Sequence, residues 1–64
     1  MTIITIETLA GEFVKQITTS DNWFNVYLEE SKMRGSKIKW LNPAKTMYET
    51  KWHDKDKILT VSRI

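Results

Sequence analysis

Hydrophobic residues recur at the spacing of β-strands in the first part of the chain. Residues 2–8 form a run rich in β-branched side chains, and residues 12–17 alternate between two faces. Both segments are expected to be strands, because β-branched residues and a period of two suit a pleated, half-buried surface. Gly11 lies in the short connection between them, which is typical of a β-hairpin.

The period then changes to that of a helix. Thr18, Thr19, Ser20 and Asp21 are all potential N-cap residues, so a helix is predicted to begin near Asp21. Its core face is expected to follow the spacing i, i+3, i+4, i+7, which selects Phe24, Tyr27, Leu28 and Ser31. Glu30 can pair with Arg34 four residues later, and Gly35 is suited to end the helix.

After Gly35 the period returns to two. Strands are expected around residues 38–41, over 46–53 and over 58–64, with a turn at Asn42-Pro43 and a polar loop at 54–57. The predicted fold is one small α+β domain, residues 1–64, in the order β-β-α-β-β-β, with a mostly antiparallel sheet and one helix packed on one face. The pattern leaves open the strand order and whether residues 42–49 are strand or short helix.

The last three strands are expected to form a meander beneath the helix. Alternation then gives an inner face of apolar side chains and an outer face of lysine and hydroxyl groups. The predicted inner residues are Ile38, Trp40, Tyr48, Trp52, Leu59 and Val61. The predicted outer residues are Lys37, Lys39, Lys51, His53, Thr60 and Ser62, with Lys55 and Lys57 in the adjoining loop.

The charge is divided between the two halves of the chain. Up to Ser31 there are one basic and five acidic residues, a net charge of −4, whereas from Lys32 onward nine basic and three acidic residues give +6. A local basic field of this kind attracts polyanions even though the net charge of the whole chain is only +2.

The basic outer face suggests a small non-enzymatic nucleic-acid-binding protein and a candidate regulator. Lysine provides the salt-dependent phosphate contacts, and Ser or Thr can hydrogen-bond phosphates and base edges. The expected nucleic-acid-binding residues are Lys37, Lys39, Lys51, His53, Lys55 and Lys57. Lysines are also typical of exposed strands that avoid aggregation, and no motif of a known binding module accompanies them.

A second hypothesis is a protein-interaction module, such as a small inhibitor, an adaptor or a homodimer. The acidic half of one chain can complement the basic half of another. Trp23, Val26 and Met33 lie off the main helix stripe and are the candidate partner-binding residues.

Catalysis and cofactors are not expected. The chain has no cysteine and one histidine, and no serine lies in a recognisable nucleophile motif. His53, Asp54 and Asp56 have ordinary turn composition and lack the glycine and distal glutamate of a calcium loop. We therefore expect no enzymatic activity, metal, cofactor or small-molecule substrate.

A membrane partner is not expected either. No apolar run approaches the roughly 18 residues needed to span a bilayer, and the start of the chain lacks the pattern of a signal peptide. The sequence thus predicts a cytoplasmic protein.

Overall fold

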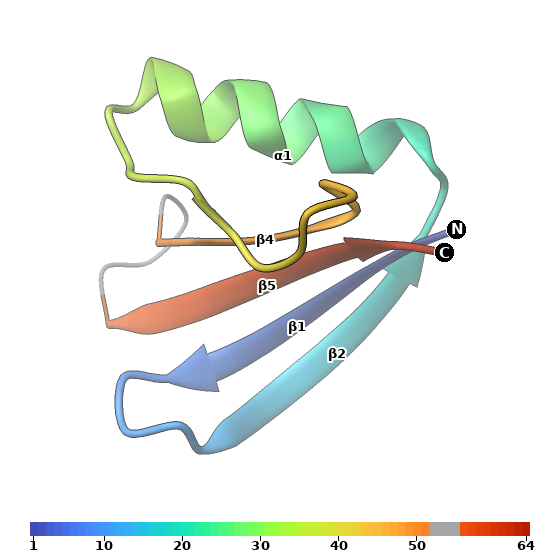
Figure 1. Ribbon diagram of the computed structural model, residues 1–64. Helices are drawn as coiled ribbons and strands as arrows, with labels where there is room; N and C mark the ends of the chain where they lie inside the picture. Colours follow the sequence, from blue (N-terminus) through green and yellow to red (C-terminus); the bar gives the residue numbers. More distant parts are fainter. Residues whose placement is uncertain (52–55) are drawn as a thin grey trace.

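A computed structural model describes residues 1–51 and 56–64 and contains one helix and one five-stranded sheet (Figure 1). The elements are β1 (Thr2–Thr8), β2 (Phe13–Thr19), α1 (Asn22–Met33), β3 (Lys39–Trp40), β4 (Met47–Thr50) and β5 (Lys57–Arg63). Their order and the α+β class confirm the sequence prediction.

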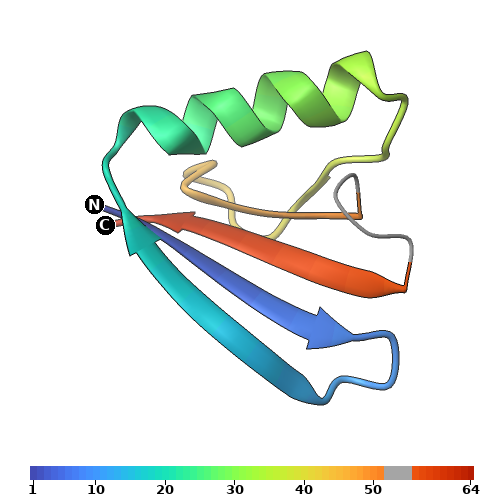
Figure 2. The same cartoon turned by 180° about the vertical axis from the view of Figure 1, so that it is seen from behind.

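The strand order, which the sequence pattern leaves open, is β2-β1-β5-β4-β3, and every pairing is antiparallel. The β1–β2 hairpin forms one side of the sheet and the β3–β4–β5 meander forms the other. β1 and β5 join the two parts, so the chain ends lie together at one end of the molecule (Figures 1 and 2). The acidic half of the chain thus supplies one side of the sheet and the basic half supplies the other.

The core lies between α1 and one face of the sheet. The helix contributes Phe24 and Leu28, the residues expected from its periodicity. The sheet contributes Ile4, Tyr48, Leu59 and Val61, with Ile6, Tyr27 and Ile38 packed around them. The predicted inner residue Trp52 lies outside the described residues.

One row of directly opposed side chains crosses all five strands on this helix-facing side. It runs Trp40, Tyr48, Val61, Ile4, Ile17. The three central members are at most 1% exposed, whereas Trp40 at one end is 36% exposed and Ile17 at the other is 37% exposed. The apolar row is therefore closed by the helix in the middle and open at both edges of the sheet.

The two ends of α1 are formed differently. Asp21 precedes the helix as expected, but its side chain makes no cap hydrogen bond and instead contacts the N-terminal ammonium group. At the other end Gly35 adopts a φ of +76°, the Ser36 amide donates to the Ser31 carbonyl, and the Gly35 amide donates to the Lys32 carbonyl. This is the glycine-dependent helix end that the sequence predicts.

The last three strands differ in extent from their predicted ranges. β3 has two residues, β4 ends at Thr50 so that Lys51 lies outside it, and β5 begins at Lys57, one residue early. Residues 52 and 53 of the predicted strand lie outside the described residues. Residues 42–46 form a turn in which the Thr46 amide donates to the Asn42 side chain (3.0 Å) and the Lys45 amide donates to the Asn42 carbonyl (3.2 Å). Local hydrogen bonds of Asn42 thus replace strand pairing there.

Candidate nucleic-acid interface

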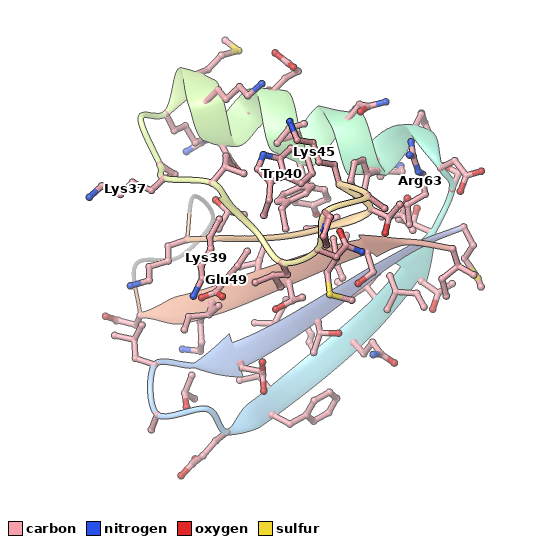
Figure 3. All side chains as sticks on the ribbon, in the orientation of Figure 1. Lys37, Lys39, Trp40, Lys45, Glu49 and Arg63 are labelled. Carbon is pink, nitrogen blue, oxygen red and sulfur yellow. The ribbon has the colours of Figure 1, made fainter. Side chains whose placement is uncertain are left out.

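Four lysines lie along the β3 side of the sheet, and we refer to them as the basic edge. Lys39 is in β3, Lys37 precedes it, Lys45 is in the β3–β4 turn and Lys51 follows β4, and all four are exposed. Figure 3 shows Lys37, Lys39 and Lys45 following the segment from the helix end to the turn. The short strand and the helix end therefore bring together charges that are spread over 15 residues of sequence.

Three of these lysines surround one shallow depression. Its volume is about 410 Å³, and its lining consists of Ser36, Lys37, Lys39, Glu49, Thr50 and Lys51. Lys37 reaches this lining from the glycine turn after α1, and Lys51 reaches it from the end of β4. The depression is a position at which an anionic group could contact several ammonium groups at once.

Among the residues that the structure describes, Glu49 is the only acidic side chain in the lining of this depression. It lies directly opposite Lys39 in the β3–β4 pairing. Within residues 1–51 and 56–64, no ion pair involves a lysine of the basic edge. The edge therefore keeps an excess of positive charge, which is the electrostatic requirement for binding a polyanion.

Trp40 gives the basic edge an aromatic surface. Its ring packs against Tyr48, with 5.6 Å between ring centroids, and against Phe24, at 6.4 Å. The Lys45 ammonium nitrogen lies 5.7 Å from the Trp40 ring centroid, within the range of a cation–π contact. The apolar packing expected for Trp40 is thus present, and a third of the residue is still exposed beside the lysines.

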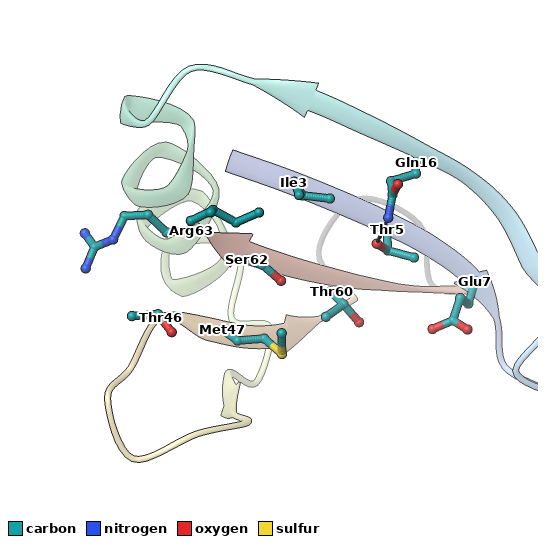
Figure 4. A pocket seen from close by; sticks show the side chains of 10 residues that line it. Ile3, Thr5, Glu7, Gln16, Thr46, Met47, Thr60, Ser62 and Arg63 are labelled. Carbon is teal, nitrogen blue, oxygen red and sulfur yellow. Dashed lines mark hydrogen bonds between the residues drawn. The ribbon is translucent and has the colours of Figure 1, made fainter. Parts of the chain in front are cut away.

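The uncovered face of the sheet is polar but not strongly basic. A second row crosses all five strands on this side, running Gln16, Thr5, Thr60, Glu49, Lys39. Figure 4 shows an open depression along this row, with a volume of about 450 Å³. Its lining combines hydroxyl groups, Gln16 and Glu7 with apolar side chains and the cation Arg63. The expected hydroxyl groups Thr60 and Ser62 lie here, whereas the lysines gather at the edge and end of the sheet.

The remaining predicted residues are distributed as follows. Lys57 is the first residue of β5, and strand alternation places it on the same side as Leu59 and Val61, the helix-facing side. His53 and Lys55 lie outside the described residues. Lys45 was not among the predicted site residues, because the turn that directs it toward Trp40 depends on the Asn42 hydrogen bonds.

The alternative partner patch lies on the outer surface of α1. Trp23 is 42% exposed, Val26 39% and Met33 80%. Among the described residues, no group of three or more potential metal ligands is close enough to hold an ion. No helix in the described part of the chain is long and apolar enough to cross a membrane.

Comparison with protein-family models, curated proteins and solved structures finds no match to this chain.

Proposed function

We propose that the protein binds nucleic acid through the basic edge. The observation that carries this proposal is the convergence of Lys37, Lys39 and Lys51 on one depression, whose described lining includes a single carboxylate. Phosphate contacts by lysine supply most of the nonspecific affinity of such proteins, and each contact releases condensed counterions.

The proposed mode of binding uses the edge of the sheet rather than its open face. The four ammonium groups lie along the β3 side and contact successive phosphates, while Thr50 and Ser36 border the depression between them. The exposed part of Trp40 lies on the same edge, where an unpaired base could stack on it. Phosphate contacts alone carry no sequence information, so the binding is expected to be largely nonspecific.

The test is a titration of fluorescently labelled random-sequence duplex DNA, followed by anisotropy at several salt concentrations. Four phosphate contacts predict a slope of log K against log salt of about −3.6, and a loss of about 150-fold in affinity between about 50 and 200 mM salt. The triple variant Lys37→Gln, Lys39→Gln, Lys51→Gln is expected to lower the affinity strongly and to reduce the slope to about −1.

The control is Lys15→Gln, which makes the same type of substitution at one position of β2, at the opposite side of the sheet. It is expected to leave the slope unchanged. A folded triple variant that binds as tightly as the unmodified protein would refute the proposal. A parallel titration with single-stranded DNA of the same length compares the affinities for single and double strands. Tighter binding to single strands would favour base stacking on Trp40.

A further inference from the structure

The outermost strand on the side away from the basic edge is long and exposes three apolar side chains. β2 has seven residues and pairs with only one described strand, β1. Phe13 is 65% exposed, Val14 44% and Ile17 37%. β3 at the other edge has only two residues, one of them Lys39, and Lys37 lies two residues before it.

An edge strand of this kind presents unpaired amide and carbonyl groups to another strand. Folded proteins normally block such edges with short strands, prolines, charges or a covering element. β3 is protected by its length and its lysines, whereas β2 contains no proline and one charged residue, Lys15. The β1–β2 hairpin also diverges from α1 toward its connecting turn in both views, so the helix leaves this part of the sheet uncovered (Figures 1 and 2).

The side chains on β2 point to a particular partner. Ile17 ends the apolar row that runs through Tyr48, Val61 and Ile4 in the core. A strand that placed another isoleucine beside Ile17 would continue this row and remove its exposed end from water. A second copy of the same chain supplies that isoleucine.

We propose that two copies of this chain associate through antiparallel pairing of their β2 strands, with the two-fold axis at Ile17. The axis is perpendicular to the sheet and lies between the two β2 strands. Directly opposed residues lie on the same face, so the axis must lie midway between the two copies of one β2 residue. An axis at Lys15 would place two ammonium groups opposite each other, which is unfavourable. An axis at Ile17 pairs isoleucine with isoleucine and Gln16 with Thr18.

The regular part of β2 is sufficient for this register. The pairing of β1 with β2 is continuous from Lys15 to Thr19, and the register shift lies beyond it, between Ile6 and Glu7 on β1. The dimer has a continuous ten-stranded sheet, and its interface is independent of the basic edge. At a strand spacing of about 4.8 Å, the two basic edges lie about 40 Å apart at opposite ends of that sheet.

Association is tested without nucleic acid, by sedimentation velocity over about 5–500 µM, because an interface of this size is expected to be concentration-dependent. Ile17→Lys places two charges at the axis and is expected to give a monomer at all concentrations, with an unchanged circular dichroism spectrum. Val26→Lys adds the same charge on the exposed surface of α1 and is expected to remain dimeric.

Cross-linking tests the register directly, because the chain has no other cysteine. Opposed residues of an antiparallel pair lie about 4.5–5.5 Å apart between Cα atoms, within the range of a disulfide. Ile17→Cys is therefore expected to give a covalent dimer on oxidation. Lys15→Cys is not, because the two positions lie at least about 13 Å apart along the strands.

Three outcomes would overturn the proposal. The unmodified protein could be monomeric throughout the concentration range, or Ile17→Lys could remain dimeric. The third outcome is a dimer that dissociates in the Val26→Lys variant and does not cross-link in the Ile17→Cys variant. That result would instead assign self-association to the surface of α1.

Discussion

The Tyr48 hydroxyl donates a hydrogen bond of 2.7 Å to the backbone carbonyl of Phe24, and both residues are buried. Tyr48 lies in β4, in the basic half of the chain, whereas Phe24 lies in α1, in the acidic half. The two aromatic rings also meet edge to face, with centroids 5.0 Å apart. This pair therefore fixes the helix to the strand next to the basic edge.

Removal of the Tyr48 hydroxyl is expected to destabilise the domain. Tyr48→Phe keeps the ring and the edge-to-face contact but deletes the buried hydrogen bond, at a cost of about 1 kcal/mol in the free energy of unfolding. Urea denaturation followed by circular dichroism measures this difference. An unchanged midpoint and slope would show that the hydrogen bond contributes nothing net to stability.

The same hydroxyl makes stability depend on alkaline pH. Burial raises the pKa of Tyr48 well above its ordinary value of 10.0, and Tyr27 nearby raises it further. The folded state thus holds this proton more tightly than the unfolded chain. The contribution of the protonated Tyr48 hydroxyl to the free energy of unfolding is complete below pH 10. It is lost as the pH rises above that value, by about 1.4 kcal/mol per pH unit for one proton.

This dependence is measured from urea midpoints between about pH 8 and 11. Tyr48→Phe serves as the reference, because it retains Tyr27 and every lysine and lacks only the buried phenol. The stability of the unmodified protein is expected to fall toward that of the variant above pH 10. Parallel curves for the two proteins would contradict the assignment to Tyr48.

Much of this fold was predictable from periodicity. The alternation of residues 2–8 and the helical spacing of Phe24, Leu28 and Ser31 depend on local patterns that burial enforces. The strand order was not predictable, because the pairing of β1 with β5 joins segments about 55 residues apart and leaves no local signal.

The location of the positive charge could be predicted only in part. Charge counting identifies the basic half, and Lys37, Lys39 and Lys51 lie together in the structure. Their position at the edge follows from the short β3 and from the end of β4 at Thr50, neither of which the alternation of side chains indicates. The exposed edge of β2 also depends on strand order, so Ile17 could not be recognised as the open end of the core from the sequence alone.

A buried hydroxyl pair provides a second link between the helix and β4. Thr50 donates to the Ser31 hydroxyl at 3.0 Å, and the two residues are 2% and 0% exposed. Ser31→Ala or Thr50→Val alone leaves a buried hydroxyl without this partner, at an expected cost of about 1–2 kcal/mol.

The double variant tests whether the two hydroxyl groups act together. Replacing both by apolar groups is expected to cost less than the sum of the single changes, with a coupling of about 0.5–1 kcal/mol in a double-mutant cycle of urea denaturation. Additive single effects would show that each hydroxyl contributes through other contacts.

Gly35 ends the helix and sets the direction of the chain toward the basic edge. Its φ of +76° is strained for residues with a side chain, although a Cβ there would meet no atom within 4 Å. Gly35→Ala is therefore expected to cost about 1 kcal/mol through backbone conformation alone. Gly35→Asn is expected to cost less, because asparagine tolerates the left-handed region. Thermal or urea denaturation of the two variants distinguishes this cause from a steric one, since asparagine is the larger side chain and would then be the more destabilising.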